Sequence, residues 1–254
     1  MIRAAALILV MLASASVACA QDATTPPDDL TKMLPDVESP EGVSTVIKWV
    51  ALVTVLSLAP AVLVMVTCFT RIIVVLGLLR QALGSPQLPP NSVLFGLALL
   101  MTVVVMSPVY RDVHRSAIAP YTAGDISRDQ AFGEAKVHIR AFMRGQIEAA
   151  GNTDDVYLFL DDETAAREQL TWGDVPIEAM VPAFVVSELK VAFLMGFRIF
   201  LPFVIIDMLV GAVLVSMGML MLPPVLISLP FKLLLFVLAN GWNLVVGTLM
   251  GSFG

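Results

Sequence analysis

Apolar segments long enough to cross a lipid bilayer constrain this chain more than any other feature. Residues 46–66 contain one charged residue, Lys48, and residues 92–109 contain none. A further block, residues 181–254, is mostly apolar to the end of the chain. About 20 apolar residues are needed for a helix to cross the hydrocarbon core. The chain is 58% hydrophobic and 14% charged, whereas a soluble domain averages about 45–50% and about 25%. We therefore expect an all-α integral membrane protein.

The first twenty residues have the features of a secretory signal peptide. A basic residue near the start precedes an apolar core and then small residues ending in "ACA". Cleavage is expected between Ala20 and Gln21, which puts the mature N-terminus outside the cytoplasm. A lipoprotein site at Cys19 is the weaker alternative. After cleavage only Cys68 remains, and we expect it to pack as a small hydrophobe.

Composition divides the rest of the chain into four parts. Residues 21–45 are acidic and Pro-rich, which predicts a flexible arm. Residues 46–109 predict a first hydrophobic helical pair with a loop at 80–91 on the cytoplasmic side. Residues 110–180 contain most of the acidic side chains and predict a small helical domain outside the cytoplasm. Residues 181–254 predict a block of hydrophobic hairpins or broken helices, so about four hydrophobic segments are expected in all.

Prolines and charges set the expected ends of these segments. The second hydrophobic segment is expected to end at Pro108. Moderate helical periodicity covers residues 128–150. The C-terminal block divides into pieces at 181–206, 208–222 and 225–250. The very short joints between them favour hairpins or broken helices over independent spans.

The distribution of basic residues predicts the orientation. Residues 67–91 carry Arg71 and Arg80 and no acidic residue, whereas the arm and the 110–180 region are net acidic. The positive-inside rule places 67–91 in the cytoplasm. The signal peptide supports the same orientation independently.

Five charged residues interrupt the C-terminal apolar block: Glu188, Lys190, Arg198, Asp207 and Lys232. Charges at membrane depth are costly and usually face a partner or a wet cavity. Glu188 and Lys190 are two residues apart, so they face different sides of a helix and need partners elsewhere. They either pair structurally, pair between subunits, or line a polar path. No second acid or histidine lies beside Asp207 to form a proton relay.

The sequence gives no indication of an enzyme. His114 and His138 lack partners at metal-ligand spacing, and no hydrolase, metalloprotease or P-loop pattern is present. We expect no cofactor and no metal. The net charge of −6 and the absence of a dense basic run argue against nucleic acid as a partner.

The stretch "SMGMLMLPP", residues 216–224, predicts a break in the apolar block. Gly218 and the Pro223–Pro224 pair prevent a regular helix through it. In lipid, irregular backbone is tolerated only where protein buries it or where it lines a water-filled cavity. Methionine suits surfaces that repack, so the stretch predicts a deformable seal at a lumen. Ordinary core packing is the simpler alternative.

Two long stretches resemble the FliP family of the flagellar type III export gate. They are "LSLAPAVLVMVTCFTRIIVVLGLLRQALGSPQLPPN" with the segment after it (56–109), and "VPAFVVSELKVAFLMGFRIFLPFVIIDMLVGAVLVSMGMLMLPP" with its continuation (181–242). The resemblance implies the main subunit of a membrane channel built with FliQ-like and FliR-like subunits in the basal body. Such a channel passes unfolded rod, hook and filament proteins. Its subunits associate into a helical cone in the bacterial inner membrane, much of it on the periplasmic side.

The resemblance also assigns residues. The family's methionine loop forms a gasket in the channel, and the matching residues here are Met219, Leu220 and Met221, although the middle position is often Met in the family. The motifs "SELK" and "LPFK" imply an ion pair between subunits, formed by Glu188 and Lys232. Arg198 stands where relatives usually carry an apolar residue.

Other functions stay open at this point. The homologous injectisome subunit is the nearest alternative, although the signal peptide and acidic arm favour the flagellar branch. An ion-coupled secondary transporter would use Asp207 or Glu188. A structural scaffold of the basal body would not need a seal at the methionines.

Overall fold

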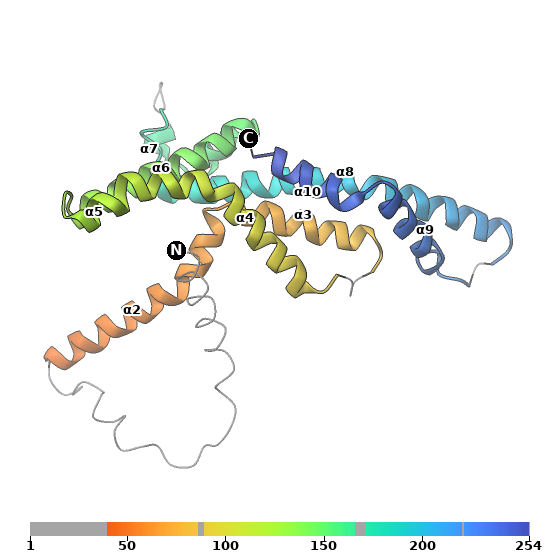
Figure 1. Ribbon diagram of the computed structural model, residues 1–254, viewed down its shortest axis with the longest axis horizontal. Helices are drawn as coiled ribbons and strands as arrows, with labels where there is room; N and C mark the ends of the chain where they lie inside the picture. Colours follow the sequence, from red (N-terminus) through yellow and green to blue (C-terminus); the bar gives the residue numbers. More distant parts are fainter. Residues whose placement is uncertain (1–39, 86–88, 166–170, 220, 254) are drawn as a thin grey trace, which may run out of the picture. The chain divides into compact units, whose positions relative to one another are not determined.

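The computed structural model describes residues 40–85, 89–165, 171–219 and 221–253, and these residues form helices and no β-strand (Figure 1). The all-α fold predicted from the apolar segments is therefore confirmed. The expected cleavage site at Ala20 and Gln21 lies outside the described residues, as does most of the arm.

The elements are named α for α-helices and η for a π-helix (η1) and a 3₁₀-helix (η2). In chain order they are α2 (Pro40–Met65), α3 (Phe69–Ala82), α4 (Asn91–Val113), η1 (His114–Ile118), α5 (Ala119–Ala123), α6 (Arg128–Ala149), η2 (Thr153–Phe159), α7 (Asp162–Ala165), α8 (Ile177–Ser216), α9 (Pro224–Leu238) and α10 (Gly241–Gly251).

Contacts divide the chain into two compact units, Met1–Leu58 and Ala59–Gly254. The described part of the first unit is the beginning of α2. The hydroxyls of Thr54 and Ser57 each donate a hydrogen bond of 2.8 Å to the carbonyl four residues earlier. These bonds satisfy two polar side chains inside an apolar helix.

The second unit is organised around α8, a helix of 40 residues. It packs against α3, α6, η2 and α9. The prediction of a break between 206 and 208 is wrong, because α8 continues through Pro202 and Asp207 to Ser216. Asp207 forms an ion pair with Lys232 on α9, so this charge is accommodated within the helix and does not mark its end.

Two hydrophobic cores lie along α8. One core joins α3 and α4 to the middle of α8 and to α9 and α10. The other joins α6 and η2 to the first turns of α8. Phe142 on α6 packs against both cores. The helix predicted from the periodicity at 128–150 is confirmed as α6, and a capping box between Ser127 and Gln130 fixes its start.

Three helices of the described residues are long and apolar enough to cross a membrane: Ile47–Met65, Asn91–Ala123 and Ile177–Ser216. The bent pair α9 and α10 would make a fourth if it forms one span.

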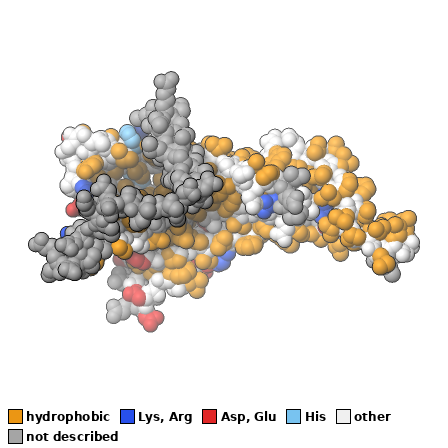
Figure 2. Space-filling model, turned by 90° about the horizontal axis from the view of Figure 1, so that it is seen from below, with side chains coloured by type: hydrophobic (Ala, Val, Ile, Leu, Met, Phe, Trp, Pro, Cys, Tyr) orange, Lys and Arg blue, Asp and Glu red, His pale blue; other side chains and the backbone are white. Residues whose placement is uncertain are grey.

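The predicted end of the second hydrophobic segment at Pro108 is wrong, because α4 continues past it to Val113 and the chain then continues through η1 and α5. In Figure 2, the end of this unit that carries α9 is covered mostly by hydrophobic side chains.

The joint between α9 and α10 is a break that the pattern of prolines and charges does not predict. Asn240 has φ 51°, the left-handed conformation that asparagine and glycine tolerate best. The two helices are bent by 63° at this point. The Asn-Gly dipeptide at 240–241 is the local signal for it.

Gly196 sets the distance between α3 and α8. A Cβ added at this position would lie 2.2 Å from Cδ1 and 3.0 Å from Cβ of Leu78. Because Leu78 Cβ is fixed to the α3 backbone, a rotamer change alone cannot relieve the contact. The two helices touch here only because residue 196 has no side chain.

We expect Gly196→Ala to destabilise the fold by about 1–3 kcal/mol, the usual cost of overpacking. Gly77→Ala on α3 is the matched control, since a Cβ there meets nothing within 4 Å and alanine favours a helix by about 0.5–1 kcal/mol over glycine. Thermal unfolding of the purified chain in detergent measures both. Equal midpoints for the two variants would show that the close approach is not needed.

Candidate functional site

A buried arginine at the start of α3 forms the most extensive polar contact in the described residues. Arg71 is 2% exposed, and Glu188 on α8 is fully buried. Arg71 Nε donates to Glu188 Oε2 at 2.9 Å, and Arg71 Nη2 donates to Glu188 Oε1 at 2.5 Å. The pair is bidentate, the geometry in which guanidinium and carboxylate bind most strongly.

The remaining donors of Arg71 reach two other segments. Its Nη1 donates to the Ser252 carbonyl at 2.9 Å and to Ser252 Oγ at 3.1 Å, and its Nη2 also donates to Gln146 Oε1 at 3.1 Å. Gln146 Nε2 donates in turn to the Phe253 carbonyl at 3.3 Å. The guanidinium also lies 4.2 Å from the centre of the Phe253 ring.

A guanidinium has five N–H donors, and Arg71 has an acceptor for each. It thereby connects α3, α6, α8 and the residues after α10. We call Arg71, Glu188, Gln146 and Ser252 the Arg71 network. Burial of a charge is tolerable only when the charge is paired and hydrogen-bonded, and both conditions are met here.

The Arg71 network bears on the predicted orientation of the chain. Arg71 is not a free basic residue of a cytoplasmic loop, because it lies in α3 and its charge is neutralised by Glu188. The other basic residue, Arg80, donates to the side chain of Asn91 at the start of α4. The positive-inside argument for residues 67–91 therefore loses Arg71 as a free charge.

A second ion pair joins α8 to α9. Lys232 Nζ lies 2.6 Å from Asp207 Oδ2, and Ser228 Oγ donates to Asp207 Oδ1 at 2.5 Å. Lys232 is buried, whereas the Asp207 side chain is partly exposed. The turn after α3 reaches this pair, because a Cβ on Gly84 would lie 3.5 Å from Lys232 Nζ.

The structure does not bring Glu188 and Lys232 together within one chain. Glu188 contacts Arg71, and Lys232 contacts Asp207. Their pairing between subunits stays a prediction. The expectation that Glu188 and Lys190 have separate partners is confirmed, since Lys190 pairs with Asp155 in η2.

The methionine stretch forms the non-helical connection predicted for it. Residue 216 ends α8, and α9 begins at Pro224. Gly218 adopts φ +74°, which only glycine adopts at no cost. The side chains of Met217, Met219 and Met221 are 67%, 40% and 98% exposed. Leu220 lies outside the described residues.

Arg198 differs from the other charges of α8. It is exposed, and among the residues that the structure describes it has no hydrogen bond or ion pair. It lines a cavity between α8 and α10 together with Met195 and Thr248. Neither the sequence pattern nor the contacts of the described residues explain why an arginine stands at this position.

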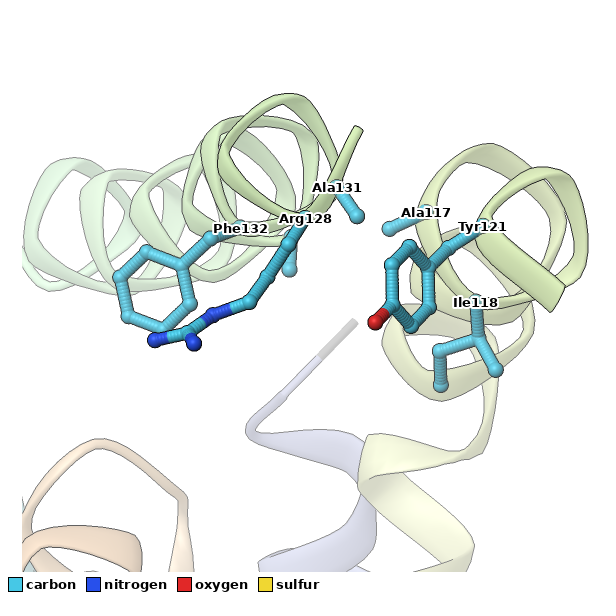
Figure 3. A pocket seen from close by; sticks show the side chains of 7 residues that line it. Ala117, Ile118, Tyr121, Arg128, Ala131 and Phe132 are labelled. Atoms are coloured by element: carbon cyan, nitrogen blue, oxygen red, sulfur yellow. The ribbon is translucent and has the colours of Figure 1, made fainter. Parts of the chain in front are cut away.

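A separate apolar cavity of about 240 Å³ lies between η1–α5 and α6 (Figure 3). Tyr121 and Ile118 reach it from one side, and Arg128 and Phe132 from the other. None of the residues predicted to be functional lines it. The described residues also contain no group of His, Cys, Asp and Glu that could hold a metal ion.

Comparison with known proteins gives consistent matches over most of the chain. The model of the FliP family matches residues 52–249. A flagellar biosynthetic protein FliP of Bacillus subtilis is 47% identical over 214 residues, covering 84% of this chain and 95% of that protein. One of Caulobacter vibrioides is 46% identical over 208 residues, covering 82% and 76%.

We expect Arg71→Met to destabilise the fold by about 3–5 kcal/mol, because it leaves the Glu188 carboxylate buried without its partner. The matched control is Arg144→Met, which removes an exposed i,i+4 pair with Glu148 worth about 0.3–0.5 kcal/mol. Denaturant unfolding in detergent compares the two. Similar losses for both variants would mean that the buried pair contributes no more than a surface pair.

Proposed function

The chain belongs to the FliP family, and we propose that it is a subunit of the flagellar type III export gate. In this role it forms, with further copies of itself and with FliQ-like and FliR-like subunits, the channel for unfolded rod, hook and filament proteins. The assembly lies in the bacterial inner membrane at the flagellar basal body. Much of it stands on the periplasmic side.

The observation that carries this proposal is the loop of exposed methionines at the joint of two apolar helices. Met221 is almost fully exposed, and Met217 and Met219 are substantially so. Large apolar side chains at the α8–α9 connection are exposed in one copy of the chain, so another surface is needed to bury them. Further copies arranged around a lumen would supply it, with the methionines facing the passing polypeptide.

The ion-coupled transporter gains no support from the two acids it would use. Glu188 forms a bidentate pair with Arg71, and Asp207 accepts from Lys232 and Ser228. A carboxylate that couples transport to an ion has to bind and release its proton or ion during each cycle, whereas both of these carboxylates are held by hydrogen-bonded partners. The injectisome subunit stays the nearer alternative, and the acidic arm and signal peptide favour the flagellar branch over it.

We expect trimming Met219, Leu220 and Met221 to Ala to open the resting channel. The change removes apolar groups worth about 0.8 kcal/mol per buried methylene, so ions should leak across the inner membrane while the complex still assembles. Replacing all three with Leu keeps the bulk and should lower secretion without leakage. Membrane conductance and secreted hook protein are measured in the same cells. A fully assembled triple-Ala gate that leaks no more than the unaltered one would contradict the gasket.

The proposed topology places the arm and residues 110–180 in the periplasm, with the mature chain beginning at Gln21. Introduced cysteines at Asp36 and Asp161 should react with an impermeant maleimide added from the periplasm, and one at Gln87 should not. The native thiol gives little background. Cys68 lies between α2 and α3, and burial raises its thiol pKa to about 11, which keeps it protonated at neutral pH. Labelling of the cysteine at position 87 from the periplasm would show that the chain has the opposite orientation.

In one chain, Glu188 pairs with Arg71 and Lys232 pairs with Asp207. The proposed ion pair between subunits, Glu188 with Lys232, therefore requires both residues to change partners when the gate assembles. Under this proposal, Glu188→Lys combined with Lys232→Glu should recover part of the complex lost by either single change. Blue native electrophoresis of membrane extracts reports complex recovery. A double variant no better than the weaker single one would assign both residues to their intrachain partners alone.

A further inference from the structure

The charge of Arg198 has no counterpart in the described part of one chain. The residue is exposed on α8 and forms no hydrogen bond or ion pair with another described residue. It borders a cavity of about 190 Å³ that Leu244 and Thr248 of α10 also line. Leu194 and Ile205, four residues before and seven residues after it, share its side of the helix and are exposed. Arginine among exposed apolar side chains is typical of a surface that binds another protein.

Asp207 lies on the opposite side of the same helix and can accept a further donor. Nine residues separate it from Arg198, which is about two and a half turns, so the two side chains leave α8 about 180° apart. The Asp207 side chain is 29% exposed, although Lys232 and Ser228 already donate to it. A carboxylate has about four acceptor sites. Asp207 can therefore accept from another cation whether or not Lys232 changes partner.

We propose, on the basis that the chain self-associates in the gate, that Arg198 of one copy pairs with Asp207 of the next copy along α8. Because the two charges lie on opposite sides of the helix, each copy has one cationic face and one acidic face. A two-fold dimer buries the same face of both copies and could not form this pair. The contact is therefore heterologous, and a copy bound to one neighbour keeps a free face for another.

The separation of the two charges also predicts how neighbouring copies are displaced. Copies that share one topology have parallel α8 helices. Nine residues of α-helix are about 13.5 Å long at 1.5 Å per residue, so pairing Arg198 with Asp207 moves each copy along the helix axis by up to about this distance. A heterologous contact repeated with such a displacement produces a helical rise and not a flat ring.

The other carboxylates of α8 fit Arg198 less well. Glu188 is fully buried, and both of its oxygens accept from Arg71. Glu178 is exposed in the first turn of α8, but it is twenty residues from Arg198, about 30 Å along the helix. Pairing with Glu178 would displace neighbouring copies by half of this 40-residue helix. Asp207 allows a longer overlap.

Photocrosslinking of the full chain in bacterial membranes identifies what lies beside Arg198 in the assembled complex. With benzoylphenylalanine at position 198, we expect crosslinks to residues 200–211 of a second, differently tagged copy. The same probe in place of Phe200, on the Asp207 side, should capture residues 191–198 of another copy. In place of Phe132, an exposed ring on α6, it should capture neither segment. Capture at position 198 of only phospholipid, a different subunit or the region around Glu178 would overturn the pairing.

Recovery of the complex on blue native electrophoresis tests the charges themselves. Arg198→Leu should lower the recovered complex several-fold, whereas Arg198→Lys, which keeps a cation, should retain most of it. Arg111→Leu, the same change at an exposed arginine of α4, should leave recovery unchanged. In a chain that carries Asp207→Asn, Arg198→Leu should lower recovery no further, because the carboxylate it pairs with is already gone.

An equal loss from Arg198→Leu with and without Asp207→Asn would assign Arg198 to a different partner and overturn the proposal. No loss in either chain would overturn it as well. If Asp207→Asn alone prevents folding, the crosslinks decide, since they need no change at Asp207.

Secreted hook protein, measured in the same cells, separates this pairing from the gate. Normal secretion without a crosslink from position 198 to a second copy would refute the pairing and leave the gate intact. The expected crosslinks in a chain whose deletion leaves hook secretion unchanged would refute the gate and leave the pairing intact.

Discussion

The bidentate pair between Arg71 and Glu188 is the interaction on which the second unit of the fold depends. It lies where α3 meets α8, and the same guanidinium also holds Gln146 on α6 and the carbonyl of Ser252 after α10. Segments more than a hundred residues apart in the sequence thus meet at one side chain. Apolar packing is non-directional, so it does not by itself fix which of these helices touch. A guanidinium with five directed donors does.

This arrangement separates a fixed end of α8 from an end that the chain leaves uncovered. Near Glu188, α8 is surrounded by α3, α6 and η2, and its side chains are largely buried. Toward Ser216 its main contact among the described helices is with α9, and many of its apolar side chains are exposed. The first end gives the subunit its shape. The second end leaves apolar surface exposed, which in the proposed gate other subunits and the exported polypeptide would contact.

The sequence was informative about helices, spans and the methionine loop because each depends on a local pattern. Apolar length predicted the all-α class, and Gly218 with Pro223 and Pro224 predicted the break before α9. It was not informative about partners of buried charges. Arg71 looked like a loop cation because its partner is 117 residues away, and no local period connects the two. The continuation of α8 past Asp207 was missed for the same reason, since Lys232 becomes its partner only through the hairpin.

The most direct test of the organising role of Arg71 is a double-mutant cycle between this residue and the C-terminal tail. Unfolding free energies in detergent are compared for Arg71→Met, for deletion of residues 252–254, and for both changes together. If the tail is held through Arg71, the combined loss should be clearly smaller than the sum of the single losses, since each change removes the same contacts. Losses that add within error would contradict the account, because the tail and the α3–α8 junction would then be independent.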